Sequence, residues 1–181
     1  MKRTGVAMLS ALLVAGTLLV AGCGGEKNLR SGFEGDIIHV GDARYQVQLT
    51  RPLNVGQQPD QVLLRGQPPA AATEEYLAVF LTIENKGKQP YTPPRDMKVV
   101  DTLGNEYLPL DATLSGFGLD FTQKILPDAG APVPDSPGAE GPDRGAMVLF
   151  RVKTQSATDN LPLVLEVPSG GKSIVEIKLD V

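Results

Sequence analysis

The residues with the most specific chemistry are Val20-Ala21-Gly22-Cys23, near the N-terminus. An apolar residue and two small residues before a cysteine are typical of a lipobox, because signal peptidase needs small residues in front of the cut. Cys23 is the only cysteine in the chain, so no disulfide competes for its thiol. We therefore expect cleavage between Gly22 and Cys23, with diacylglycerol attached to Cys23 through a thioether.

The segment before the cysteine supports this interpretation. Lys2 and Arg3 form a short positive region, and no charged residue follows until after Cys23. The alternative is a transmembrane helix, since the uncharged stretch would be long enough to span a bilayer. The small residues at the cut favour a signal peptide over residues 1–22. Two or three acyl chains such as palmitate would then hold the chain on the extracytoplasmic face of the cell membrane, because one chain alone binds only marginally.

The remaining residues do not form a catalytic set. His39, the only histidine, lies between Ile38 and Val40 in an apolar run, so we expect it to be a half-buried structural residue. A serine or cysteine triad needs a base near neutral pH, and a Cys/His zinc site needs thiolates. The acid pairs Asp96 with Asp101, and Glu74 with Glu75, resemble ordinary solvated carboxylates. The sequence predicts no enzyme and no cofactor.

Four acidic residues share one proline- and glycine-rich stretch, residues 127–145: Asp128, Asp135, Glu140 and Asp143. Carboxylate oxygens suit calcium, but their spacing does not match an EF-hand loop. We therefore predict no metal site, keep these four as the candidates if the loop does bind calcium, and expect a solvated, disordered excursion.

A second group of candidates is apolar. Tyr91, Pro93 and Pro94 follow the strongest predicted strand, and loops at the ends of sandwich domains are common contact surfaces. We name them as contact-loop candidates. The alternative is that they pack onto the core.

The charge balance narrows the choice of partner. The chain carries a net charge of −4 and would lose Lys2 and Arg3 with the signal peptide. An acidic domain is a poor binder of nucleic acid or anionic lipid headgroups through bulk charge. The chain has five Phe, four Tyr and no Trp, which disfavours a stacking platform for sugars.

The elements that must position these residues are strands. Apolar residues alternate at residues 45–50, 76–84, 145–153, 163–167 and 175–181, and a short apolar run covers 37–40. Residues 97–101 and 106–110 flank a Gly104-Asn105 turn and predict a hairpin. Residues 76–84 are apolar on both faces, which indicates a central strand. Residues 52–73 suggest an added strand or a helical turn.

These patterns predict an all-β fold, an antiparallel β-sandwich of seven or eight strands over residues 36–181. Residues 23–35 would carry the lipid and act as a flexible tether after the cleaved signal peptide.

Several stretches also resemble a known family. They are Tyr76-Leu77-Ala78-Val79, Glu84-Asn85-Lys86-Gly87, Val99-Val100-Asp101, Gly104-Asn105-Glu106-Tyr107 and residues 145–150. They are similar to a domain family of unknown function in small secreted lipoproteins of Gram-positive bacteria, grouped with telokin-like, immunoglobulin-like immunoprotective extracellular antigens. The resemblance implies an immunoglobulin-like sandwich at the cell envelope, and it carries over no catalytic residue.

We therefore expect a membrane-anchored envelope lipoprotein that presents an immunoglobulin-like domain for contacts with an envelope protein. The alternative is a carrier that binds calcium or a small envelope solute. An enzyme acting on the cell wall stays open, since a fold does not fix a function.

Overall fold

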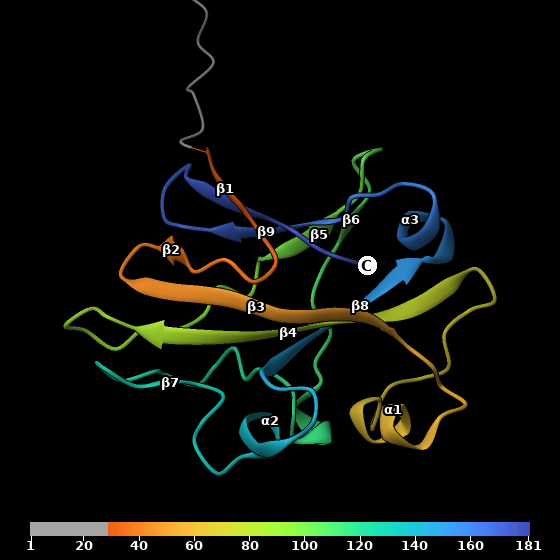
Figure 1. The fold of residues 1–181 in the computed structure, drawn as a ribbon, viewed down its shortest axis with the longest axis horizontal. Helices are drawn as coiled ribbons and strands as arrows, with labels where there is room; N and C mark the ends of the chain where they lie inside the picture. The colour runs from red at the N-terminus through yellow and green to blue at the C-terminus, as the bar shows by residue number, and fades with distance from the viewer. Residues whose placement is uncertain (1–28) are drawn as a thin grey trace, which may run out of the picture.

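Two β-sheets pack face to face in the computed structural model, which describes residues 29–181 (Figure 1). In spatial order, sheet A contains β1 (Leu29–Phe33), β10 (Ile174–Lys178), β9 (Val164–Pro168), β5 (Lys98–Val100) and β6 (Glu106–Tyr107). Sheet B contains β2 (Ile38–Val40), β3 (Ala43–Leu53) and β4 (Glu74–Asn85), and the far edge of β4 pairs with β8 (Ala146–Lys153) and β7 (Gly130–Ala131). The expected all-β sandwich is confirmed.

The helices are short. α1 (Gln58–Leu63) and α2 (Pro137–Glu140) lie on the outer side of sheet B, whereas α3 (Thr154–Thr158) connects β8 to β9 at one end (Figure 1). A 3-10 turn, η1, covers Thr113–Ser115. Within residues 29–181, no helix is long and apolar enough to cross a membrane.

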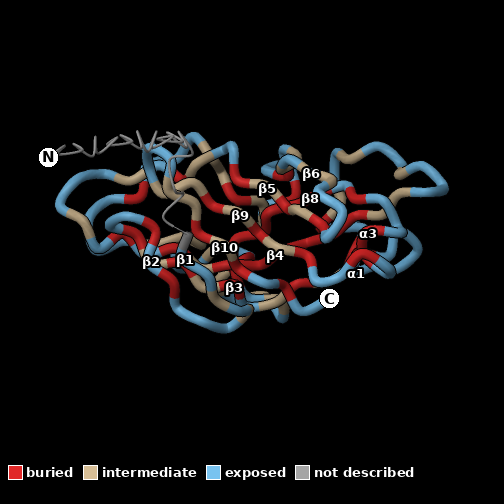
Figure 2. The backbone as a smooth tube through the Cα atoms, turned by 90° about the horizontal axis from the view of Figure 1, so that it is seen from above, coloured by how far each residue is buried: buried red, intermediate tan, exposed pale blue. Residues whose placement is uncertain are grey.

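β4 is the central strand that its two apolar faces predict. Leu77, Val79 and Leu81 belong to the main core between the sheets. Tyr76 and Phe80 alternate with them and belong to a second cluster on the outer face of sheet B. Buried residues therefore run through the middle of the molecule on both sides of β4 (Figure 2).

The sandwich contains ten strands rather than seven or eight, because β1 and β7 carry no alternating apolar pattern. β1 lies in the segment expected to be tether. It pairs with β10 through the backbone, from Leu29 opposite Ile174 to Phe33 opposite Lys178, and this is the one parallel pair among the named strands. Backbone pairing does not require an apolar side-chain pattern, so apolar alternation in the sequence could not predict this strand.

Residues 127–145 are not the disordered excursion that their composition suggests. Gly130 and Ala131 form β7 against β4, and α2 follows at Pro137–Glu140. Gly138 is buried, and its carbonyl accepts a hydrogen bond of 2.8 Å from the Gly145 amide. Small residues allow the backbone to approach the sheet closely, so the same glycines that suggest disorder permit packing here.

Candidate ligand-binding groove

A groove of about 790 Å³ opens at the end of the sandwich where β3 ends and β4 begins. Its walls are residues 52–55 at the end of β3, Gln61 and Leu64 in and just after α1, residues 67–72, and residues 74–76 of β4. Pockets of this volume are typical of small-molecule sites.

One wall is fixed by two hydrogen bonds. The Tyr76 hydroxyl donates to the Pro68 carbonyl, and Gln67 Nε2 donates to the Asp111 carbonyl at 2.6 Å. Tyr76 is almost fully buried, so its hydroxyl needs such a partner. Pro68 and Pro69 also limit the backbone freedom of the wall. The segment after α1 is thus held against β4 without forming a strand.

α1 forms the opposite support. Gln57 precedes it in an extended conformation, and Pro59 occupies its first turn, where a missing amide hydrogen costs nothing. Leu63 is buried in the same apolar cluster as Leu53 and Tyr76. The helix is only six residues long, so its stability depends on this packing.

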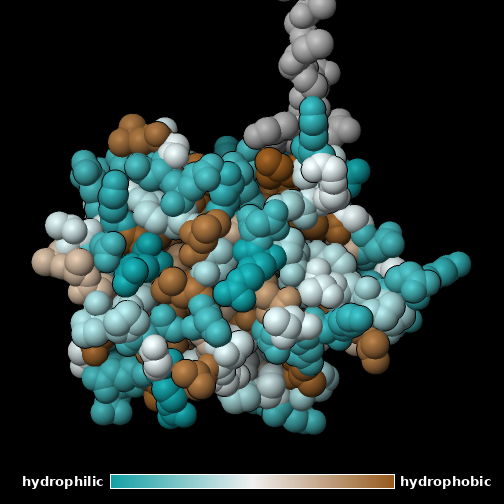
Figure 3. Space-filling view, turned by 180° about the vertical axis from the view of Figure 1, so that it is seen from behind, coloured by the Kyte–Doolittle hydropathy of each residue, from teal (hydrophilic) through white to brown (hydrophobic). Residues whose placement is uncertain are grey.

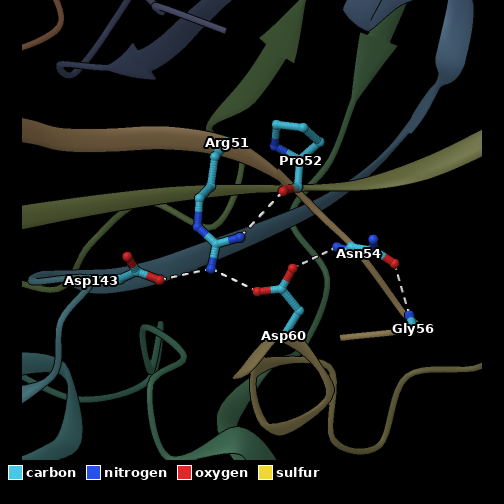
Figure 4. Close-up of polar contacts among 6 residues, drawn as sticks. All are labelled: Arg51, Pro52, Asn54, Gly56, Asp60 and Asp143. Atoms are coloured by element: carbon cyan, nitrogen blue, oxygen red, sulfur yellow. Dashed lines mark hydrogen bonds and ion pairs between the residues drawn. The ribbon is translucent and has the colours of Figure 1, made fainter. Parts of the chain in front are cut away.

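Arg51 at the end of β3 joins three segments (Figure 4). One of its terminal nitrogens lies 2.7 Å from Asp60 Oδ1 of α1 and 2.8 Å from Asp143 Oδ2 of the 127–145 segment. The Asp60 side chain is only 5% exposed, whereas Arg51 and Asp143 are partly open to solvent. The ion pairs therefore fasten both α1 and the proline-rich segment to sheet B.

Asp60 is also satisfied by the backbone. Its Oδ2 accepts a hydrogen bond of 2.6 Å from the Asn54 amide, and Asn54 Oδ1 in turn accepts one from Gly56 (Figure 4). Burial alone would raise the pKa of Asp60, but the hydrogen bonds from Arg51 and Asn54 outweigh it and lower that pKa. The hydrogen bonds to Asp60 also raise the pKa of Arg51. Both groups stay charged at neutral pH.

Two neighbouring residues at the start of β4, Glu74 and Glu75, have carboxylates in different environments. Glu74 lies 3.5 Å from Arg151 Nε, so its charge is partly balanced. Glu75 is half-buried and, among residues 29–181, its carboxylate has neither a hydrogen bond nor an ion pair. Burial raises the pKa of Glu75. Glu75 alternates with Tyr76 along β4 and pairs with Val152 of the main core, so its side chain lies on the opposite face of the strand from Tyr76.

A second buried acid lies at the β5–β6 hairpin. Asp101 accepts hydrogen bonds from the amides of Leu103 and Asn105 and from the side chains of Asn105, Ser156 and Asn160, at 2.6–3.2 Å. Burial acts to raise the pKa of Asp101, but these hydrogen bonds prevail and lower it. Its lone pairs are occupied, so Asp101 acts as a structural centre for the hairpin and α3.

Cys23 and Gly22 lie outside the described residues, so the predicted lipidation and cleavage stay predictions. The prediction for His39 was wrong. His39 is exposed on the outer face of β2, opposite Arg44 in the strand pairing, because its neighbours Ile38 and Val40 take the buried positions.

The four acidic candidates of the 127–145 loop do not converge. Asp128, Asp135 and Glu140 are exposed, and Asp143 is paired with Arg51. The described residues contain no group of three or more His, Cys, Asp or Glu side chains placed to hold a metal ion. Asp128 and Asp135 have positive φ angles of 58° and 61°, so they occupy turn positions.

The contact-loop candidates face inward. The Tyr91 hydroxyl lies 2.8 Å from that of Tyr45 in the core, with the two rings edge to face. Burial raises the pKa of both hydroxyls, so they stay protonated. Pro93 is buried and Pro94 is half-buried. These residues therefore pack onto the core, which was the alternative to a contact loop in the sequence analysis.

Sequence reasoning missed Arg51 and Asp60, and it took Glu75 and Asp101 for ordinary solvated acids. The pairing of Arg51 with Asp60 depends on the chain turning back at Asn54, and no local pattern encodes it. Glu75 did carry a signal, because it is an acid beside a strand that is apolar on both faces. Asp101 carried one too, since Asp before Gly104-Asn105 is a common turn acceptor.

Comparison with known proteins identifies a shared fold only. No family model and no curated protein matches the chain. An uncharacterised β-sandwich protein from Clostridium difficile 630 is 17% identical, with 86% of this chain and 97% of that chain covered and a TM-score of 0.53. A conserved hypothetical protein from Bacillus anthracis is 9% identical, with 82% and 94% covered and a TM-score of 0.51. The chain therefore shares the sandwich fold of these proteins, and the function must be argued from its own residues.

Proposed function

We propose that this protein is exported, lipidated at Cys23 and held at the extracytoplasmic face of the cell membrane, where its sandwich acts by binding. The observation that carries the anchor is the Val20–Cys23 lipobox behind an uncharged segment. The fold adds a constraint. Only residues 24–28 separate Cys23 from the start of β1, which allows at most about 20 Å between lipid and sheet. The anchor would keep the sandwich at the membrane surface.

Fatty-acid labelling tests the anchor. In cells that express the full chain and are fed an alkyne fatty acid, the parent protein should be labelled and Cys23→Ala should be unlabelled and uncleaved. Lys27→Ala, a change between the lipobox and β1, should be labelled like the parent. An unlabelled parent, or a labelled Cys23→Ala, would contradict the proposal.

We favour a small solute as the bound species, because the groove has the volume of a small-molecule site and the expected contact loop packs inward. Catalysis has less support. Strongly shifted pKa values often mark catalytic acids, but the lone pairs of Asp60 and Asp101 are taken by donors of the protein. Hydrolysis of an envelope polymer by the purified protein, lost in Glu75→Gln, would overturn the binding proposal.

A protein partner is the second candidate, at a different surface. The Thr102 amide donates to the Asn160 carbonyl at 3.2 Å, so the two turns that carry Leu103 and Leu161 meet. Leu103 is 73% exposed and Leu161 is 40% exposed, so both leucines are open to solvent. On the face seen in Figure 3, apolar residues mostly stand apart among polar ones. This pair would be the contact point.

A photo-crosslinking amino acid placed in intact cells distinguishes this candidate. Substitution at Leu103 and at Leu161 should give the same single adduct, and substitution at the exposed Thr122 should give none. If none of the three positions forms an adduct, or if all three do, the leucine pair is not a specific contact.

A further inference from the structure

We propose that one side of the sandwich docks on the anionic phospholipid headgroups of the membrane that anchors it. This side consists of the start of β1 and three turns, residues 41–42, 86–88 and 169–173, and we call it the basic face. The inference deepens the proposed function and rests on it, because it says how the anchored domain lies on its membrane.

Backbone pairing and hydrogen bonds bring the parts of the basic face together. The β9–β10 turn lies beside the first residue of β1, because β1 and β10 pair in parallel. The Gly41 amide of the β2–β3 turn donates to Ser169 Oγ at 3.0 Å. The Lys86 amide, just after β4, donates to the Asp42 carbonyl at 3.0 Å. The three turns therefore follow one another along one side of the molecule, from the start of β1 to the end of β4 (Figure 1).

Charged residues are distributed unevenly between this side and the rest of the protein. The basic face carries four exposed basic residues, Arg30, Lys86, Lys88 and Lys172, and one exposed acid, Asp42. The whole chain holds 17 Lys and Arg against 21 Asp and Glu, so the basic face reverses the overall balance. A domain of negative net charge can therefore present a positive surface locally.

The protein leaves most of this positive charge free. In the described part of the chain, neither Lys88 nor Lys172 forms an ion pair. Lys86 Nζ lies 3.1 Å from Glu84 Oε2, but Glu84 also pairs with Arg44. One carboxylate thus serves two cations, and the basic face keeps an excess of positive charge that is open to solvent.

A bilayer surface fits this charge because the anchor brings the two together. Only residues 24–28 lie between Cys23 and β1, so the edge of the basic face stays within about 20 Å of the lipid. Each Lys or Arg beside an anionic bilayer strengthens binding by a factor of about five. The described turns carry no exposed large apolar side chain, so the attraction would be electrostatic, without insertion.

Docking on the basic face would turn the groove away from the membrane. β4 begins at Glu74 in the lining of the groove and ends at Asn85, beside the basic face. An extended strand of that length spans about 35 Å. The groove would therefore open toward the envelope and remain accessible to solutes.

A gadolinium chelate on the lipid headgroups reports which part of the sandwich lies near the bilayer. The full chain is placed in nanodiscs of phosphatidylcholine, with or without phosphatidylglycerol, and the paramagnetic relaxation of backbone amides is measured by NMR. From neutral to anionic discs, the relaxation at residues 86–88 should rise at least about threefold, and that at residues 53–55 in the groove should fall. High salt should reverse both changes, because it screens the attraction.

Two double variants locate the charge. Lys88→Gln with Lys172→Gln removes two charges from the basic face and should abolish most of the rise. Arg65→Gln with Lys153→Gln removes the same charge from exposed positions after α1 and at the end of β8, and should leave the rise unchanged.

The proposal is overturned by any of three results: no rise at residues 86–88 in anionic discs, a rise that persists in high salt, or equal loss in the two double variants. The NMR spectrum shows whether each variant is folded, and the comparison of lipids on the parent protein needs no variant. Either a lipid on Cys23 or an uncleaved apolar segment holds the full chain on the disc. Failed fatty-acid labelling therefore leaves docking measurable, and failed docking leaves the labelling of Cys23 intact.

Discussion

At the scale of residues, the acids of this protein fall into groups that the sequence does not separate. Asp60 and Asp101 are buried and charged, and the surrounding chain supplies donors to each. Glu75 is half-buried without a donor, and Asp128 is solvated. Desolvation is costly unless hydrogen bonds replace water, so these environments give the same chemical group different roles.

The Arg51 pairs give the first prediction. Arg51→Met should lower the free energy of unfolding by about 3 kcal/mol, because it leaves the buried Asp60 without its cation. Asp143→Asn should cost less than about 1 kcal/mol, because Asp143 is partly exposed and Arg51 keeps Asp60. Urea unfolding of both variants measures the difference. Equal costs would show that the two pairs are equivalent, contrary to their burial.

Asp101 gives the second prediction. Asp101→Ala should cost about 3 kcal/mol, since it leaves several donors of the hairpin and α3 unsatisfied. The pKa of Asp101 is below its ordinary value, so the stability from the charged form is present above that value and is lost as pH falls toward the folded-state pKa. Acid unfolding of the parent and of Asp101→Ala should therefore converge at low pH. Asp96 is exposed, so Asp96→Asn is the control and should unfold in acid like the parent protein.

At the scale of elements, alternation found the strands that bury a side-chain face, such as β3, β4 and β8. It did not find β1, whose Leu29-Arg30-Ser31-Gly32-Phe33 sequence does not alternate and which depends on backbone pairing with β10. Composition likewise suggested disorder for residues 127–145, because glycine and proline have the same frequency in a solvated loop and in a tightly packed one. Contacts with distant residues distinguish these cases.

Gly145, just before β8, gives the third prediction. Its φ is 130°, and a Cβ there would lie 2.7 Å from the Leu81 amide nitrogen of β4. Gly170 also has a positive φ, at 91°, but a Cβ there would meet nothing within 4 Å. Gly145→Ala should therefore cost at least about 2 kcal/mol more than Gly170→Ala in thermal unfolding. Similar losses would mean that strain at φ, rather than crowding, decides both.

At the scale of the whole molecule, the groove was beyond prediction from sequence. It joins the end of β3 to a segment about fifteen residues later and to the start of β4, and only the return of the chain through α1 brings them together. The sequence did predict the sandwich that supports it. The sequence did not predict that residues 29–35 also belong to the sandwich, where Glu34 accepts hydrogen bonds from the Thr50 and Asp180 amides.

The domain boundary gives the fourth prediction. Chains beginning at Gly24 and at Leu29 should unfold at the same temperature, because both contain β1 and Glu34. A chain beginning at Asp36 should lose on the order of 4 kcal/mol, as the pairing with β10 and the Glu34 bonds disappear. For a domain of this size, that loss lowers the melting temperature by about 10 °C. If all three chains melt at the same temperature, residues 29–35 do not stabilise the sandwich and belong to the tether.

The parallel pairing of β1 with β10 has a mechanical consequence. β1 begins at Leu29, six residues along the chain from Cys23, and β10 runs in the same direction toward the C-terminus. Tension between the two ends of the chain would pull these strands along their axes in opposite directions. Such shear loads all their hydrogen bonds at once, whereas peeling breaks bonds one after another. A sandwich joined in this way would stay folded under a sustained pull between its membrane anchor and whatever holds its other end.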